Sequence, residues 1–217
     1  MSAVSPLPAR EPISQSQLEA MIDTIAAKDS DVARALAQIG YPQTRSAPKG
    51  FESFVRAVAA QQVSTHAARA IFERVLAGLD GDCCAANILQ HDEDSLRALG
   101  LSRPKARYIL GMAQAAQDGS FDPDSLPAMD DEDAIAHITA LKGFGRWSAE
   151  IYLLFSEGRE DMFPAADLAI QKGYQSLKGL NDTPNEKRLR ELAQPWAPYR
   201  GAMSIFVWHW YGSTTLS

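Results

Sequence analysis

The sequence predicts an all-α fold. Apolar residues recur at three- and four-residue spacing along most of the chain, and no segment shows the sustained alternation expected of a half-exposed strand. Glycine and proline recur between these segments, where they end helices. The 217 residues, 46% hydrophobic and 22% charged, suffice for a buried core in one domain or two tightly joined lobes, and they exclude a disordered or fibrous chain.

The helices can be placed in order along the chain. Residues 1–13 contain three prolines and are expected to form a flexible arm. Ser14 is a candidate N-cap with Gln17 at capping-box spacing, and a second short helix ends at Gly40. Helical spacing resumes at Phe51, pauses at the polar pair 61–62 and continues to Gly78. Further helices are expected at about 84–90, 93–99, 104–117, 131–140, 146–156, 167–177, 185–194 and 198–210.

Charge is unevenly distributed along the chain. With 21 Lys and Arg against 27 Asp and Glu, the net charge of −6 argues, taken globally, against a nucleic-acid ligand. Residues 95–117, however, contain four bases and no acid, whereas residues 118–133 contain seven acids and no base. A basic face can therefore coexist with the global charge, although charge alone leaves equally open that both stretches are solvated helix faces.

Cysteine content and the chain start limit the class of protein further. Cys83 and Cys84 are the two cysteines, too few for a disulfide framework or a four-cysteine cluster, and we expect both to be thiols in a reducing compartment. The first residues lack the apolar segment of a secretory signal, and no apolar run approaches the roughly 20 residues of a membrane helix. We therefore expect a soluble, intracellular protein that does not bind membranes.

Residues 138–150 contain a short glycine turn, Leu141-Lys142-Gly143-Phe144-Gly145, between two helical patterns. The two glycines are expected to supply positive φ and close backbone approach, and Gly145 leaves the first N–H groups of the next helix exposed as a phosphate seat. Lys142 and Arg146 flank the turn and add positive charge. Taken alone, the segment is more typical of a plain helix–turn–helix corner.

A second segment, Phe163-Pro164-Ala165-Ala166-Asp167-Leu168, places an acid at the start of a helix directly after a proline-containing loop. In isolation, Asp167 would be interpreted as a simple N-cap.

Together, the glycine turn, the Trp147 that follows it and the Phe-Pro-x-x-Asp segment resemble the helix-hairpin-helix (HhH-GPD) DNA glycosylase superfamily. The resemblance is to its alkyladenine branch, the DNA-3-methyladenine glycosylase II type. Three further segments agree with the branch: Gln-Gln-Val-Ser at 61–64, Gly-Leu-Ser-Arg-Pro-Lys-Ala at 100–106, and Trp-Ala-Pro-Tyr-Arg at 196–200 followed by Trp208. The resemblance rests on five ordered motifs and spans roughly residues 32–211.

The resemblance implies a single glycosylase domain over 1–217, made of two helical lobes with a DNA-binding cleft. Lobe one would comprise about 14–50 plus 161–217, and lobe two about 51–160, including the hairpin. Asp167 would then lie where the lobes join.

The resemblance also implies an activity: flipping a damaged base out of the duplex and hydrolysing its N-glycosidic bond in base excision repair. Asp167 matches the catalytic aspartate, which stabilises positive charge on the sugar and can orient or deprotonate the attacking water. Trp147 and Trp208 match pocket-lining tryptophans suited to a cationic alkylated purine such as 3-methyladenine, and Ile151 stands where some relatives have tyrosine. Lineages that also cut the backbone carry a lysine nucleophile where this chain has Trp147, which predicts a monofunctional enzyme without lyase activity.

The remaining implied contacts concern DNA and an ion. Gln62 matches the residue that wedges into the gap left by the flipped base, although it could equally be a polar helix-end residue. The main-chain carbonyls of Thr139, Leu141 and Phe144 would hold a monovalent cation in the hairpin, with no other cofactor and no iron–sulphur cluster. The partner would be double-stranded DNA with a damaged base, bound by a monomer that is cytoplasmic and nucleoid-associated in a bacterium or nuclear in a eukaryote.

Three alternatives stay open at this point: a glycosylase for another damaged base, a non-catalytic helix-hairpin-helix DNA-binding protein, and a helical interaction protein. Asp167 argues against the binding module, because an acid facing the DNA backbone would repel phosphate.

Overall fold

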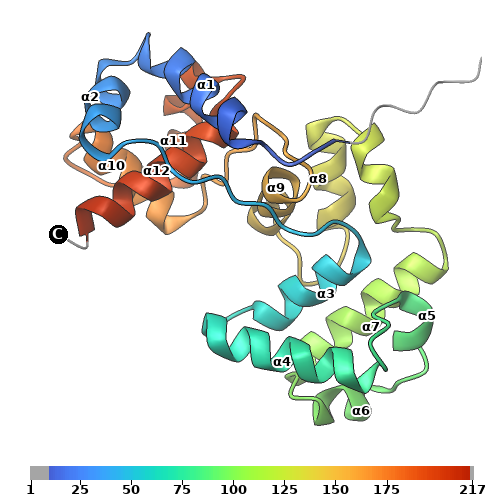
Figure 1. The fold of residues 1–217 in the computed structure, drawn as a ribbon. Helices are drawn as coiled ribbons and strands as arrows, with labels where there is room; N and C mark the ends of the chain where they lie inside the picture. The colour runs from blue at the N-terminus through green and yellow to red at the C-terminus, as the bar shows by residue number, and fades with distance from the viewer. Residues whose placement is uncertain (1–9, 216–217) are drawn as a thin grey trace, which may run out of the picture. The chain divides into compact units, whose positions relative to one another are not determined.

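The computed structural model describes residues 10–215, and within that range it consists of helices joined by turns and loops, without a strand (Figure 1). This confirms the predicted all-α class. The α-helices are α1 (Gln15–Ala26), α2 (Ser30–Ile39), α3 (Phe51–Ala60), α4 (Thr65–Gly78), α5 (Ala85–Ile88), α6 (Glu93–Ala98), α7 (Arg103–Gln117), α8 (Asp131–Thr139), α9 (Arg146–Phe155), α10 (Leu168–Lys178), α11 (Glu186–Leu192) and α12 (Arg200–Thr215). Two 3₁₀ helices, η1 (Pro123–Ala128) and η2 (Gln194–Trp196), complete the set. Among residues 10–215, no helix has both the length and the apolar character needed to cross a membrane.

The ends of the helices agree with the sequence at most positions. Ser14 forms the expected capping box with Gln17, in which each side chain satisfies a backbone N–H of the other residue. The C-terminal helix differs from the expectation of 198–210, because it begins at Arg200 and continues to Thr215.

The segment before α1 also differs in part from the expected flexible arm. Residues 1–9 lie outside the described residues, but Ile13 is buried and its carbonyl accepts a hydrogen bond from Thr44 Oγ1 at 2.6 Å. The carbonyl of Glu11 lies where a Cβ on Gly158 would be, so only glycine fits at that position. The last residues of the proposed arm are therefore packed against the chain.

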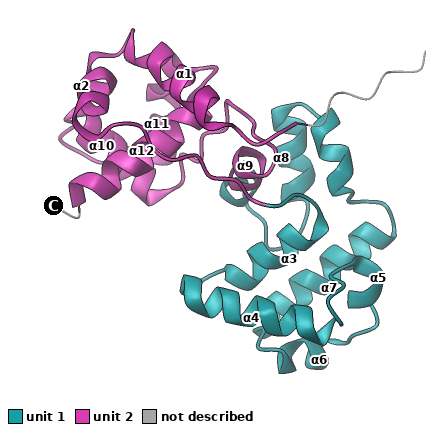
Figure 2. Cartoon of the chain, in the orientation of Figure 1, with its two compact units in different colours: residues 1–8, 48–149 teal, residues 9–47, 150–217 magenta. Residues whose placement is uncertain are grey.

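The chain divides into two compact units, shown in teal and magenta in Figure 2. Among the described residues, the first comprises 48–149, and the second comprises 10–47 and 150–215. The first boundary lies close to the one expected near residue 50, whereas the second lies within α9, at 149/150, rather than near residue 160.

The core of the first unit centres on Phe54 of α3. Its ring makes edge-on contacts with Phe121 (centroids 5.1 Å apart) and with Phe144 of the hairpin (5.4 Å). All three side chains are buried, so an aromatic side chain anchors the hairpin to α3.

The core of the second unit is built on α10 and α12, which pack against each other. They approach closely at Gly173, where a Cβ would lie 2.7 Å from Val207 Cγ1. The buried Trp196 packs against Tyr174 (centroids 5.0 Å apart), and its Nε1 donates to Asp29 Oδ2 at 2.9 Å. This packing fixes the middle of α10, the helix that Asp167 caps.

Candidate functional site

Asp167 is the N-cap of α10, and its carboxylate is fixed by three hydrogen bonds. Oδ1 accepts from the backbone N–H groups of Ala169 (2.9 Å) and Ile170 (3.1 Å), and from Trp208 Nε1 of α12 at 3.2 Å. The side chain is half-buried. The capping interpretation is therefore correct, but capping does not account for the indole contact, which joins the acid to a second helix.

The loop that carries Asp167 is held from within. The N–H of Ala165 donates to Phe163 O at 2.7 Å, and that of Asp167 donates to Pro164 O at 2.9 Å. Gln171, one turn into α10, donates its Nε2 to Ala165 O at 2.8 Å. These hydrogen bonds hold the backbone of the loop in place up to the first turn of α10.

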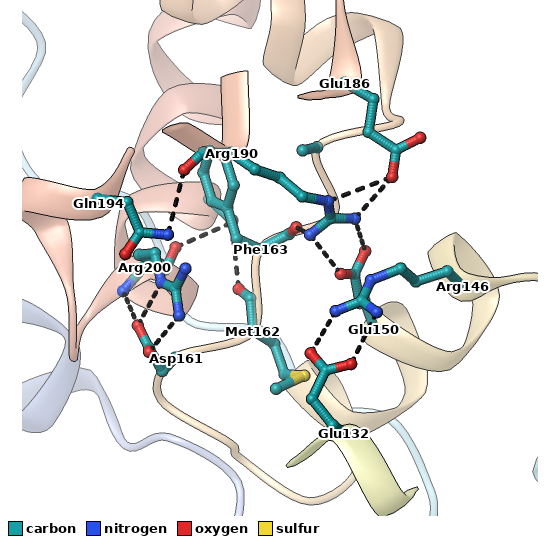
Figure 3. A network of polar contacts seen from close by, with 12 residues as sticks. Glu132, Arg146, Glu150, Asp161, Met162, Phe163, Glu186, Arg190, Gln194 and Arg200 are labelled. Carbon is teal, nitrogen blue, oxygen red and sulfur yellow. Dashed lines mark hydrogen bonds and ion pairs between the residues drawn. The ribbon is translucent and has the colours of Figure 1, made fainter. Parts of the chain in front are cut away.

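Two ion-pair networks clamp the start of the same loop (Figure 3). Arg200 binds Asp161 through Nε (2.8 Å) and Nη2 (2.6 Å). Arg190 binds the buried Glu150 and also donates to the carbonyl of Phe163 at 3.0 Å. Bidentate arginine contacts fix direction as well as distance. The two networks therefore hold the loop in one conformation, which places the carboxylate of Asp167.

Trp208 also forms part of the wall of a cavity in the second unit. Its ring stacks on that of Phe155, with centroids 5.8 Å apart and planes 26° apart. The cavity has a volume of about 510 Å³, within the usual range for small-ligand sites. It is lined by Tyr41, Pro42, Gln43, Arg45, Phe155, Ile205, Trp208, His209, Gly212 and Ser213.

The other two residues expected in the pocket lie on α9. Ile151 is half-buried and precedes Phe155 by one helical turn, so both lie on one face of α9. Trp147 is 44% exposed in the first turn of α9, an unusual exposure for so large an apolar side chain.

The hairpin connects α8 and α9 through residues 140–145. Gly143 has φ +96°, and a Cβ there would lie 2.5 Å from Tyr108 Cδ2. Both the backbone conformation and the close approach of the tyrosine ring therefore require glycine at this position. The expectation of positive φ at Gly145 is wrong, because that residue is outside the positive-φ region. Open space surrounds the position of a Cβ on Gly145, which leaves the start of α9 accessible from outside.

The carbonyls of Thr139, Leu141 and Phe144 belong to the end of α8 and to the turn after it. The final carbonyls of a helix lack intrahelical donors, and carbonyl oxygens are suitable ligands for a hard cation. Leu141 O also accepts from Phe144 N at 3.2 Å. Within residues 10–215, no group of three or more His, Cys, Asp or Glu side chains could hold a metal ion.

The stretch of bases at 95–117 does not form an unpaired basic face. Arg97 pairs with Asp94, and both Arg103 and Arg107 pair with Glu93, at distances of 2.7–3.2 Å. Lys105 is buried, and burial lowers its pKa. The acids that neutralise the arginines, Glu93 and Asp94, lie in the first turn of α6, directly before residue 95. A count of charges within 95–117 therefore does not include them.

The hairpin charges are divided in the same way. Arg146 forms a bidentate ion pair with Glu132 of α8, one of the seven acids of residues 118–133 (Figure 3). Lys142 is exposed on the turn. Positive charge at the hairpin is therefore concentrated on one lysine and on the N-terminal amides of α9.

Comparisons with known proteins agree with this geometry. Residues 55–198 match the family described as HhH-GPD superfamily base excision DNA repair protein. The chain belongs to the HhH-GPD superfamily. This confirms the resemblance drawn from the five motifs.

Individual relatives lie in the alkyladenine branch of the superfamily. The chain is 32% identical over 161 residues to DNA-3-methyladenine glycosylase 1 of Schizosaccharomyces pombe, covering 73% of this chain and 71% of that protein. A crystal structure of DNA-3-methyladenine glycosidase from Bacillus halodurans superposes with a TM-score of 0.83 at 29% identity, covering 91% of each chain. The S. pombe 3-methyladenine DNA glycosylase Mag1 in complex with abasic DNA superposes with a TM-score of 0.77 at 28% identity, covering 91% of this chain and 98% of that one.

Several side chains that contribute to the candidate site were not predicted from the sequence. Phe155 could have been found from its four-residue spacing to Ile151, and Glu132 from its place in the acid stretch. Gln171 and Arg45 gave no signal, because their contributions depend on which segments meet in space.

The pairing of the bases predicts a shallow salt dependence of DNA binding. With Arg97, Arg103, Arg107 and Arg146 paired with carboxylates, we expect the slope of log K against log salt to be about −1 to −3. Lys142→Ala should make the slope shallower by about 1, because it removes one phosphate contact. Fluorescence anisotropy of a labelled duplex across a KCl series measures both slopes. Lys28→Ala, an exposed lysine at the end of α1, is the control and should leave the slope unchanged; a slope steeper than about −5 for the wild type would contradict the prediction.

Proposed function

We propose that this protein is a monofunctional DNA glycosylase that flips alkylated purines such as 3-methyladenine out of duplex DNA and hydrolyses the N-glycosidic bond. The observation that carries the proposal is Asp167, a half-buried carboxylate whose Oδ1 is fixed by two backbone amides and by an indole that also lines an aromatic cavity. The names of the relatives support the same substrate class.

The departing base needs little acid catalysis. Alkylation at N3 or N7 makes the purine cationic, so the C1′–N bond can break with its electron pair leaving on the base, which becomes neutral. Positive charge then develops on the sugar, where the carboxylate of Asp167 stabilises it. A water molecule attacks C1′, and its proton passes to Asp167 or to solvent, which completes the hydrolysis.

The aromatic side chains suit such a base. A cationic ring gains about 0.5–2 kcal/mol over the face of an electron-rich aromatic side chain. Trp208, stacked on Phe155, and the exposed Trp147 are the candidates for this role, and Ile151 would adjust the breadth of the pocket. In this chain Trp147 also occupies the place of the lysine used by bifunctional relatives, and indole cannot form a Schiff base.

DNA would be held mainly through the hairpin backbone. The residues concerned are Lys142, Gly143, Phe144, Gly145 and Arg146; since the ring of Phe144 is buried, its contribution would come from main-chain atoms. A monovalent cation on the carbonyls of Thr139, Leu141 and Phe144 would add charge facing a phosphate. Gln62, exposed in the turn between α3 and α4, would fill the gap left by the flipped base. The protein would act as a monomer in the compartment that holds the DNA.

The deciding experiment is release of free base from duplex DNA methylated at purine N3 and N7, followed by chromatography of the products. The wild type should release methylated purines and leave abasic sites with an intact backbone. Borohydride added during turnover should trap no covalent enzyme–DNA adduct. Binding without release would favour a non-catalytic DNA-binding protein, and a trapped adduct would overturn the monofunctional assignment.

A further inference from the structure

The turn that carries Gln62 has a backbone conformation that needs external support. It lies between the end of α3 and the start of α4, and Gln62 has φ +55°. Left-handed backbone at a residue with a Cβ costs about 1–2 kcal/mol, so such a turn persists only where neighbouring groups hold it.

Two side chains provide that support, one at the end of α3 and one at the residue directly before Gln62. Lys105, buried on α7, donates its Nζ to the carbonyl of Ala59 at 2.9 Å, near the end of α3. Gln61, directly before Gln62, donates its Nε2 to the carbonyl of Gly143 in the hairpin at 2.8 Å. The second bond joins two segments that are 82 residues apart in the sequence.

The hairpin end of this bond is itself packed against two helices. Gly143 packs against the ring of Tyr108 on α7, and Phe144 packs against Phe54 on α3. The bond from Gln61 therefore ties the turn to a point fixed by two helices, and Gln61 is half-buried where it makes this contact.

We propose that Gln61 is a positioning residue that holds the turn carrying Gln62 at a fixed distance from the hairpin. Resting on the proposed function, this means that the group inserted into the duplex and the backbone that grips the phosphates move as one piece. The wedge is inserted only when the base is flipped. Loss of the tie should therefore weaken flipping and slow base release while leaving affinity for undamaged duplex unchanged.

Gln61→Met tests this, because methionine keeps the length of the side chain but has no N–H donor and adds no charge. The matched control is Gln175→Met in the second unit, where a half-buried glutamine likewise donates Nε2 to backbone carbonyls. Flipping is measured by the fluorescence of 2-aminopurine placed opposite a methylated base, and base release in single-turnover assays on methylated duplex. For Gln61→Met we expect both to fall by about 3- to 10-fold, with less than twofold change in affinity for undamaged duplex. Gln175→Met should change neither.

A double-mutant cycle with Gln62→Ala decides whether Gln61 acts through the wedge. If it does, Gln61→Met should add little to the defect of Gln62→Ala, because the group it positions is already gone. If the fold-loss of the double variant equals the product of the two single-variant losses, the proposal is overturned. Flipping at the wild-type level by Gln61→Met would overturn it as well. Equal loss of flipping and of undamaged-duplex affinity would show that the hairpin itself had moved, and would overturn it too.

The flipping measurement separates this inference from the proposed function. A wild type that flips the base without releasing it would refute the proposed activity, while the comparison of Gln61→Met with Gln175→Met would still decide the role of Gln61. A wild type that does not flip the base would refute both.

Discussion

Asp167→Asn should lower the single-turnover rate of base release from methylated DNA by about 100- to 10,000-fold, since it removes the negative charge that faces the developing cation. Asparagine caps helices about as well as aspartate, and its oxygen can still accept from Ala169, Ile170 and Trp208. The variant should therefore fold normally and bind abasic DNA, so that the loss is confined to the chemical step.

The control for this variant is Asp92→Asn, which makes the same substitution at another helix N-cap. Asp92 caps α6, and its Oδ1 accepts from the N–H of Ser95 at 2.8 Å. This control should retain wild-type release within about twofold, showing that the change of an N-cap is not by itself harmful. Equal release by wild type and Asp167→Asn would remove Asp167 from its assigned role.

Glu157→Gln should lower the free energy of unfolding by about 3 kcal/mol, the largest stability effect that we expect from a near-isosteric substitution. Glu157 and Arg159 form an ion pair at 2.9 Å in which both side chains are only 1% exposed. Removing one charge of a buried pair leaves the other in a poorly solvating environment, and this desolvation cost causes most of the loss.

Urea unfolding followed by circular dichroism measures the change as a lower midpoint with an unaltered slope. The matched control is Glu73→Gln, which breaks the pair with Arg69 on the surface of α4, where the two side chains are 60% and 81% exposed. Water screens such a pair, so the control should cost less than about 1 kcal/mol. Similar losses of unfolding free energy for both variants would show that burial does not explain the contribution of the Glu157–Arg159 pair to stability.

The helices were predictable because their signals are local. The capping box at Ser14 and the apolar spacing before Gly40 depend on residues a few positions apart, which the sequence displays directly. The N-cap position of Asp167 was also predictable from a local pattern, an acid after a proline-containing loop at the start of a helix. The sequence itself could not indicate that Trp208, 41 residues later, donates a hydrogen bond to that acid.

Features that depend on pairing between segments were misjudged or missed. The bases of 95–117 were compatible with a basic face, but Glu93 on the preceding helix pairs with Arg103 and Arg107. Gly145 was expected to need positive φ because it belongs to a glycine turn, whereas Gly143 provides the reversal by itself. The tie from Gln61 to the hairpin had no sequence signature, since any carbonyl can accept such a bond.

The neutralised arginines have a consequence for how the protein searches a genome. Non-specific attraction to DNA comes mostly from the release of counterions by unpaired cations. Since Arg97, Arg103, Arg107 and Arg146 are already paired with carboxylates, each encounter with undamaged duplex should be brief. We expect the protein to dissociate often and to survey many separate stretches of DNA in succession, instead of travelling far along any one of them.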